Sequence, residues 1–378
     1  MTSAARPAVT PDSIRWGRYA GRDVIPLWVA DMDFPAPPAI VEALQTRVAD
    51  GLFGYGRPLD SLIAAVTDHC AREYGWAIDP DWLVWLPGLV PGLHVASLAV
   101  GATGDGVFAA TPVYPPFLSA PVESGRRLLA MPLVCDEAGW HWDFAATDAV
   151  LRAARLFLLC HPHNPVGRAW REDELWQIAA LAEKHDLVVC SDEIHCDLTL
   201  SGPHRPFATL APEIAARTIT LMAPSKTYNI AGLGCAFAII PDATLRRRFR
   251  AAMHGIVPHP NVLGLAACEA AYRDGGEWRR RLIETLRGNA LRVEQAVDAL
   301  PGLSMTRVEA TFLAWIDCRE LGVEHPAAFF EQAGVGLSDG ADFAPGGAYA
   351  RYVRLNFGTP RALLDEALER IGRACASL

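Results

Sequence analysis

Short apolar runs alternate with amphipathic stretches through the middle of the chain. The runs at 155–160, 187–190, 218–222 and 236–240 contain mostly apolar and β-branched residues, as expected of strands that are covered on both faces. Between the first two runs, apolar residues recur at helical spacing over 172–185. This alternation predicts an α/β fold, in which a mostly parallel sheet carries helices on both faces.

The flanking regions extend this pattern. Strands are predicted at 81–85 and 106–110, with a Gly/Pro loop over 87–92 and a helix over 94–99 between them. The span 82–104 has no Asp, Glu, Lys or Arg and could cross a bilayer, but Pro87, Gly88, Pro91 and Gly92 interrupt it. We therefore reject a membrane span.

After Pro241 the pattern changes to that of a smaller α+β unit. The regions 245–253 and 264–300 are predicted to be mostly helical, with strands at 312–316 and 352–356 and a last helix at 360–377. A chain of 378 residues exceeds one ordinary core. We expect an N-terminal segment (1–50) that joins the small domain, a large domain (51–285) and a small C-terminal domain (286–378).

Composition limits the partners and the compartment. The net charge is −9 and the most basic run, 246–250, is short, which argues against a nucleic-acid-binding protein. Nine cysteines include no C-x-x-C pair, so reduced thiols in a cytoplasmic protein are expected. Residues 1–11 show no signal-peptide pattern. We expect a small-molecule substrate, with neither nucleic acid nor membrane as a partner.

Polar side chains follow several of the predicted strands. Asn164 follows the run at 155–160, Asp192 follows the run at 187–190, and Lys226 follows the run at 218–222. Open α/β sheets bind ligands at the carboxyl ends of their strands, so these residues are expected to meet at one edge.

This combination suits one cofactor. A buried lysine amine is more often neutral and can form a Schiff base with an aldehyde. An aspartate can keep a pyridine nitrogen protonated, an Asn amide can donate to a phenolate oxygen, and a helix N-terminus can bind phosphate. Pyridoxal 5'-phosphate (PLP) carries all four groups, so PLP is the predicted cofactor.

The motifs also resemble a known family. Asn164-Pro165-x-Gly167, Asp192-Glu193-x-His195, Ser225-Lys226-x-x-Asn229-x-x-Gly232 and Arg354-Leu355-Asn356-Phe357-Gly358 occur in the order found in fold-type I PLP enzymes of the aspartate aminotransferase superfamily (class I/II). The segment 28–34, Trp-Val-Ala-Asp-Met-Asp-Phe, is similar to that of the cystathionine β-lyase (C–S lyase, MalY/PatB-type) subfamily. The resemblance covers nearly the whole chain.

By this resemblance, Lys226 carries the Schiff base and moves the Cα proton, Asp192 pairs with the ring nitrogen, and Tyr114 stacks on the ring. The implied cofactor site comprises Gly88, Leu89, Val90, Tyr114, Asn164, Asp192, His195, Ser225 and Lys226, with Tyr55 contributed by the second subunit of a homodimer. The implied substrate site comprises Arg354, which binds the α-carboxylate, and Asn164, Tyr55 and Asp31.

Several of these residues have plainer interpretations. Asp192 could cap a helix, Tyr114 could pack in the core, and Arg354 could pair with a buried acid. Asn164 could act as a turn former, with a cis peptide bond to Pro165. Three histidines (His161, His163 and His195) could suggest a metal, but the residue pattern does not support one.

One position departs from the family pattern. Many aminotransferases place an arginine eight residues after the lysine to bind the phosphate, and here that position is Gly234. The implied activity is cleavage of L-cystathionine or another L-cysteine S-conjugate to a thiol, pyruvate and ammonia. The alternatives are an aminotransferase, which uses the same cofactor and lysine, and a regulatory protein with residual lyase activity.

Overall fold

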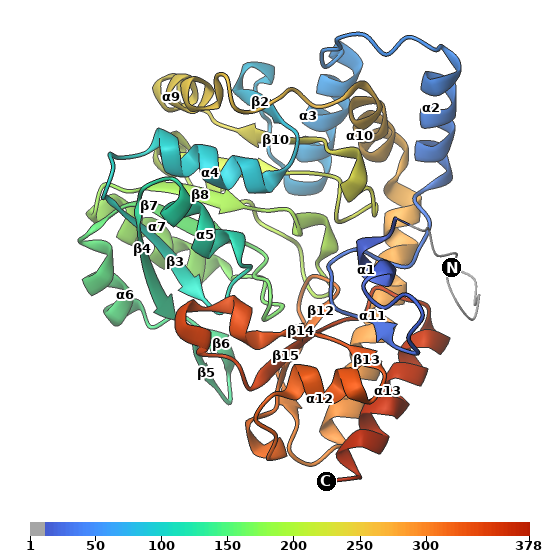
Figure 1. Ribbon diagram of the computed structural model, residues 1–378. Coiled ribbons are helices and arrows are strands. Elements are labelled where there is room, and N and C mark those ends of the chain that lie inside the picture. The colour runs from blue at the N-terminus through green and yellow to red at the C-terminus, as the bar shows by residue number, and fades with distance from the viewer. Residues whose placement is uncertain (1–11) are drawn as a thin grey trace.

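The computed structural model describes residues 12–378 and consists of two layered units with the N-terminal chain between them (Figure 1). The signal-peptide prediction concerns residues 1–11 and therefore falls outside the described part. Within 12–378, no helix is both long and apolar enough to cross a membrane. The uncharged span 82–104 instead forms strand β2 (Leu83–Leu86) and helix α4 (Leu89–Ala99), as expected from its prolines and glycines.

A seven-stranded sheet forms the centre of the larger unit. Its strands lie in the order β2-β10-β9-β8-β7-β3-β4. Besides β2, they are β3 (Gly106–Thr111), β4 (Arg127–Pro132), β7 (Ala154–Cys160), β8 (Val188–Asp192), β9 (Thr218–Met222) and β10 (Ala236–Ile239). Strand β10 is antiparallel to both neighbours, and the other pairs are parallel. The predicted mostly parallel sheet is confirmed.

Both faces of this sheet are covered, which explains the apolar runs. In β7, Leu156 and Leu158 pack on the face covered by α4, α5 (Pro116–Glu123) and α9 (Ala243–Met253). Phe157 and Leu159 pack on the opposite face, under α6 (Phe144–Leu151), α7 (Glu172–Lys184) and α8 (Pro212–Ala216). Helices α3 (Asp60–Tyr74) and α10 (Val262–Asp274) pack around Phe237 of β10.

The smaller unit is an α+β structure, as predicted. Its sheet has the order β11-β12-β15-β14, formed by Ser304–Met305, Leu313–Asp317, Tyr352–Asn356 and Ser338–Asp339. The remaining elements of this region are α11 (Gly276–Asp298), α12 (Pro326–Gln332), β13 (Val335–Gly336) and α13 (Arg361–Cys375). Helix α11 runs without a break through the predicted domain boundary at 285. The three-part domain division stays a prediction.

The N-terminal chain contacts both units. Strand β1 (Ile25–Pro26) pairs with β13, and Ile25, Leu27 and Phe34 join the core of the small unit. Helix α1 (Ile14–Gly17) precedes this strand, and helix α2 (Pro38–Ala49) packs against α10 of the large unit. The chain between β1 and α2 therefore passes along the junction of the two units (Figure 1).

The structure differs from the sequence-based expectations at a few places. Helix α4 begins at Leu89, so the predicted loop over 87–92 is mostly helical and that prediction was wrong, because a proline in the first turn of a helix costs no hydrogen bond. The region 264–300 is mostly helical, as predicted, and contains two helices, α10 and α11, divided at Gly275. Strand β4 and the hairpin of β5 (Val134–Asp136) and β6 (Gly139–His141) had no expected counterpart, since their residues are partly exposed and lack an apolar run.

Candidate active site

A cavity of about 200 Å³ lies where the carboxyl ends of β7, β8 and β9 meet the N-terminus of α4. The cavity brings together most of the predicted cofactor site. Its lining comprises Ala30, Gly88, Leu89, Val90, Pro91, Tyr114, Phe117, Cys160, Asn164, Asp192, Ile194, His195, Ser225, Lys226 and Ala231. The strand-end argument therefore predicted correctly that Asn164, Asp192 and Lys226 meet at one edge of the sheet.

Lys226 follows β9 and presents its amine inside the cavity. Nζ donates a hydrogen bond to the Ala30 carbonyl oxygen at 2.6 Å. Burial, together with the nearby Arg354 guanidinium, lowers the pKa of Lys226 to about 8, although Asp31 and Asp192 oppose the shift. A larger fraction of this amine is therefore neutral near pH 7 than of an ordinary lysine, as a nucleophile requires.

Asp192 ends β8 with its side chain buried against the cavity. Its Oδ1 accepts a hydrogen bond from the Ile194 amide at 3.1 Å, and burial raises the pKa of the carboxyl to about 7. The short helix that follows, Cys196–Leu198, has His195 rather than Asp192 at its N-cap. The capping interpretation is therefore wrong, and the carboxyl is left facing a space in which a cationic ring nitrogen would be its natural partner.

His195 also faces the cavity, as a neutral ring. Burial, Lys226 and Arg354 all lower the pKa of its imidazole, to about 3. The buried Nδ1 atom has no hydrogen-bond partner. A neutral imidazole with an unused nitrogen can still donate to or accept from a ligand oxygen.

Arg354 lies in the middle of β15 and is 5% exposed. One amino group donates to Asn164 Oδ1 at 3.1 Å, and the other donates to the Trp28 carbonyl oxygen at 2.8 Å and to Ser338 Oγ at 3.1 Å. The guanidinium also lies 5.0 Å from the centre of the Phe343 ring. Within the described part of the chain, every hydrogen-bond acceptor of Arg354 is thus electrically neutral.

No carboxylate within residues 12–378 lies at ion-pair distance from Arg354. The interpretation of Arg354 as half of a buried ion pair is therefore wrong for this chain. Burial lowers the pKa of the guanidinium to about 10, so it remains charged near neutral pH. A buried cation without a counterion is a binding site for an anion, and the planar guanidinium suits a carboxylate.

Tyr114 and Asn164 lie side by side at the cavity wall. The Tyr114 amide donates to the Asn164 carbonyl oxygen at 3.1 Å, and the peptide bond between Asn164 and Pro165 is cis. The Tyr114 side chain is only partly buried, and burial and the nearby Asp192 raise the pKa of its hydroxyl. Tyr114 therefore lines the cavity and also packs against the hydrophobic core of the large unit.

The first turn of α4 supplies an anion site. Gly88 is its N-cap, no side chain caps the helix, and the first turn contains no acidic residue. Gly88, Leu89 and Val90 of this turn line the cavity together with Ser225, and the first N–H groups of a helix have no partner within the helix. Phosphate is the anion that such a helix start commonly holds.

The absence of an arginine at position 234 has a structural reason. Gly234 has a φ of +59°, and a Cβ placed there would lie 3.2 Å from the Pro87 carbonyl oxygen. Residues with a side chain rarely adopt this conformation. The backbone conformation between Ser225 and β10 thus disfavours the side chain that the family pattern would place near the phosphate.

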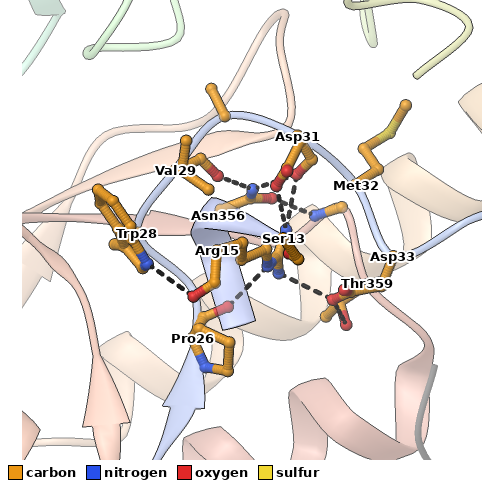
Figure 2. A network of polar contacts seen from close by, with 12 residues as sticks. Ser13, Arg15, Pro26, Trp28, Val29, Asp31, Met32, Asp33, Asn356 and Thr359 are labelled. Carbon is orange, nitrogen blue, oxygen red and sulfur yellow. Dashed lines mark hydrogen bonds and ion pairs between the residues drawn. The ribbon is translucent and has the colours of Figure 1, made fainter. Parts of the chain in front are cut away.

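Three predicted site residues lie outside the cavity lining: Arg354, Tyr55 and Asp31. Arg354 contacts the lining through its hydrogen bond to Asn164. Tyr55 is fully exposed in the segment between α2 and α3. Asp31 lies next to Ala30, with its side chain 39% exposed and 3.4 Å from Arg15, and burial raises the pKa of its carboxyl (Figure 2). Asp31 is close enough to Lys226 to influence the pKa of that amine.

The histidines near the cavity do not form a metal site. His161 Nε2 contacts the Arg205 carbonyl oxygen at 3.0 Å, and His163 Nε2 contacts the Pro112 carbonyl oxygen at 2.7 Å. Over residues 12–378 there is no group of three or more His, Cys, Asp or Glu residues that could hold a metal ion.

Sequence reasoning missed several contributors to the site. Ala30 and Trp28 act through backbone carbonyl oxygens, which leave no signal in a sequence. Ser338 and Phe343 contact Arg354 from a short strand and a turn that lack a recognisable pattern. The proximity of segment 28–34 to the lysine was signalled only by its resemblance to one subfamily.

Comparison with known proteins agrees with this geometry. The aminotransferase class I and II family matches residues 22–371. Cystathionine beta-lyase PatB of Bacillus subtilis is 37% identical over 96% of this chain and 96% of its own. The crystal structure of OvoB (46% identity, TM-score 0.95) covers 99% of this chain and 98% of its own. The crystal structure of cystalysin from Treponema denticola contains pyridoxal 5'-phosphate. It is 32% identical in sequence, with a TM-score of 0.94, and the match covers 100% of this chain and 100% of its own. The chain belongs to the aminotransferase class I and II family.

Proposed function

We propose that this protein is a PLP-dependent carbon–sulfur β-lyase that converts an L-cysteine S-conjugate such as L-cystathionine to a thiol, pyruvate and ammonia. The observation that carries the proposal is the buried Arg354 cation, held only by neutral oxygens beside a cavity that contains a lysine with a lowered pKa. A carboxylate-bearing amine fits both groups at once. Relatives that are named cystathionine beta-lyase and C–S lyase support the same reaction.

The residues of the cavity suit PLP group by group. Free N–H groups at the start of α4, together with Ser225, would hold the phosphate. Asp192 would pair with the ring nitrogen, Asn164 and His195 with the phenolate oxygen, and Tyr114 with the ring face. The unpaired buried carboxyl of Asp192 and the unused nitrogen of His195 are the features that such a ligand would satisfy.

When bound, PLP supplies an electron sink that makes the Cα proton of an attached amino acid acidic. Arg354 binds the α-carboxylate and so orients the Cα–H bond toward Lys226. The Lys226 amine removes the Cα proton, and the electron pair left on Cα expels the β-thiolate as the Cβ–S bond breaks. Tyr114 donates a proton to the leaving sulfur. Water then completes the conversion of the remaining three carbons to pyruvate and ammonia.

Asp31 and Tyr55 complete the proposed substrate site. Asp31 adds a negative charge near the Lys226 amine, and we propose that it contacts the substrate from beside the cavity. Tyr55 would act on the site of a second copy, because its side chain projects away from the body of its own chain.

We propose that the protein is a homodimer with shared sites. Three exposed apolar residues (Leu52, Phe53 and Leu59) flank Tyr55 in the segment between α2 and α3, which forms the loop at the top of Figure 1. Such a patch on a water-soluble surface favours burial against another chain. A Tyr55→Phe variant and a Lys226→Ala variant should each be impaired alone, and mixed dimers should recover part of the activity. A lack of recovery, with mixed dimers shown to form, would argue against shared sites.

A cytoplasmic location is part of the proposal. All nine cysteines are unpaired, and seven of them are buried. Proteins of reducing compartments commonly keep their thiols in this form.

The test uses the purified PLP-loaded protein with L-cystathionine. Release of pyruvate and thiol without an added keto acid is expected for the lyase. The alternative is an aminotransferase, which the family match also supports, and which would form product only when a keto acid is added. Product that depends strictly on a keto acid would refute the lyase proposal.

A further inference from the structure

The most extensive polar network outside the cavity is centred on Arg15, whose side chain is 1% exposed (Figure 2). Its Nε donates to the Pro26 carbonyl oxygen at 2.8 Å, and Nη1 donates to the Asp31 carbonyl oxygen at 2.6 Å. Nη2 forms an ion pair with Asp33 Oδ2 at 2.8 Å. The indole of Trp28 in turn donates to the Arg15 carbonyl oxygen at 3.1 Å. One buried cation thus fastens helix α1 to segment 28–34, which we call the strap.

The strap is also held by two asparagines. Asn356 of β15 donates to the carbonyl oxygens of Val29 and Asp31, each at 2.6 Å (Figure 2). Asn229 of the large unit accepts from the Met32 amide at 2.9 Å and donates to the Met32 carbonyl oxygen at 2.8 Å. The backbone of the strap is therefore fixed by side chains from both units and from α1.

The carbonyl oxygens of the strap touch the two cations that the reaction uses. Ala30 accepts from the Lys226 amine at 2.6 Å, and Trp28 accepts from Arg354 at 2.8 Å. The next carbonyl after Ala30, that of Asp31, receives the Arg15 hydrogen bond. A shift of the strap would therefore move the hydrogen-bond acceptors of both Lys226, the proposed proton-transfer group, and Arg354, the proposed carboxylate-binding group.

We propose that Arg15 is a positioning residue for the reaction. It fixes the strap from the side of α1, and through the carbonyl oxygens of Trp28 and Ala30 it sets where the Arg354 guanidinium and the Lys226 amine lie. This inference rests on the proposed lyase function. Arg15 itself is absent from the cavity lining and touches neither cation.

The local charges explain why an arginine is needed. Asp33 is 3% exposed, and its carboxylate also accepts from Trp16 Nε1 at 2.9 Å and from Thr359 Oγ1 at 2.7 Å. A buried carboxylate requires a counterion, and only the forked guanidinium can satisfy it and two backbone carbonyls together. A lysine would keep the charge but lose that geometry.

The test compares four variants of the full-length PLP-loaded protein. Arg15→Met removes the network, Arg15→Lys keeps its charge, and Arg15→Met/Asp33→Asn removes the unpaired carboxylate that Arg15→Met leaves behind. Arg22→Met is the matched control, because Arg22 is an exposed arginine of the same segment that pairs with Glu331 and has no contact with the strap. We would measure the melting temperature, kcat and KM for L-cystathionine, and the visible circular dichroism of the bound cofactor.

We expect kcat/KM of Arg15→Met to fall by about 10- to 100-fold, with a smaller loss for Arg15→Lys and less than about twofold for the control. In the double variant, the melting temperature should recover while kcat/KM stays low. The visible circular dichroism should change in Arg15→Met and in the double variant, because it reports the setting of the cofactor at Lys226.

Recovery of activity together with stability in the double variant would overturn the proposal, since Arg15 would then be only structural. A folded Arg15→Met protein with wild-type kcat/KM would do the same. If Arg15→Met alone fails to fold, the double variant and Arg15→Lys still decide the question. If the unaltered protein makes no pyruvate, the lyase proposal fails, whereas the circular dichroism comparison still tests the role of Arg15.

Discussion

Replacing Arg354 by methionine tests the reasoning most directly. In the free protein, Arg354 forms no ion pair with a carboxylate within the described residues. Its removal therefore leaves no buried carboxylate without a counterion in that part of the chain. The Trp28 carbonyl oxygen keeps a hydrogen bond from Ser338 Oγ at 2.6 Å, whereas Asn164 Oδ1 and Ser338 Oγ each lose the donor that Arg354 supplied. We therefore expect the variant to fold and to bind PLP, with its defect confined to the substrate.

The size of that defect follows from the burial of the site. Loss of one partner from a buried carboxylate–guanidinium pair costs about 3–5 kcal/mol. Since 1.36 kcal/mol corresponds to a factor of ten, kcat/KM for L-cystathionine should fall by about 10²- to 10⁴-fold. Arg354→Lys should lose less than Arg354→Met, because it keeps the charge but not the bidentate geometry.

The assay follows pyruvate release and adds a competitive inhibitor that lacks the carboxylate. A cysteamine S-conjugate has the amine and the sulfur but no α-carboxylate, so its inhibition constant should be nearly the same for the unaltered protein and for Arg354→Met. Arg351→Met, three residues earlier and exposed, is the control. A folded Arg354→Met protein that keeps kcat/KM within about threefold would refute the assignment.

Three further predictions concern the same cavity. Lys226→Ala should lower kcat by about 10²- to 10⁴-fold, and borohydride should no longer fix the cofactor to the protein, as mass spectrometry of the peptides would reveal. In the cofactor-free protein, burial raises the pKa of Asp192 from 3.8 to about 7, so its contribution to stability is present below pH 3.8 and is lost as the pH rises through 7. Asp192→Asn should therefore gain stability over the unaltered protein at pH 8 but not at pH 4, by up to about 4 kcal/mol in urea unfolding. Gly234→Ala should lower the free energy of unfolding by about 1–2 kcal/mol in the same assay, because the residue has a φ of +59° and its new Cβ would lie 3.2 Å from the Pro87 carbonyl oxygen. An unchanged urea midpoint would contradict this reasoning.

The sequence predicted the central sheet well, because its signal is local. Leu156 to Leu159 are all apolar since each face of β7 is covered by helices, and this produces a run that is readable without any knowledge of the fold. The same holds for Asn164, Asp192 and Lys226, which follow strands that end at one edge of the sheet. Strand β4, with a mixed pattern on the sheet edge, left no comparable signal.

The start of α4 shows the limit of local reasoning. Pro91 and Gly92 suggested a loop, yet both lie within the helix. Proline is tolerated in a first turn, and a Cβ at Gly92 would lie 3.1 Å from the Leu221 side chain, so the glycine allows α4 to approach β9 closely. A glycine required by close packing cannot be distinguished in the sequence from a glycine required by a turn.

By itself, the sequence determined the sheet, the edge at which the chemistry gathers and the residue types that suit PLP, because strand burial and strand ends are encoded by neighbours along the chain. Only the tertiary structure decided that Arg354 has neutral partners, that the conformation of Gly234 disfavours an arginine, and that Arg15 fastens a strap whose carbonyl oxygens hold Lys226 and Arg354. Those features depend on backbone oxygens, and the contacts of the strap with Lys226 and Arg354 join residues 196 and 326 positions apart. Such contacts form only when the two units pack against the N-terminal chain. The type of a residue does not predict which backbone carbonyl oxygen it will contact.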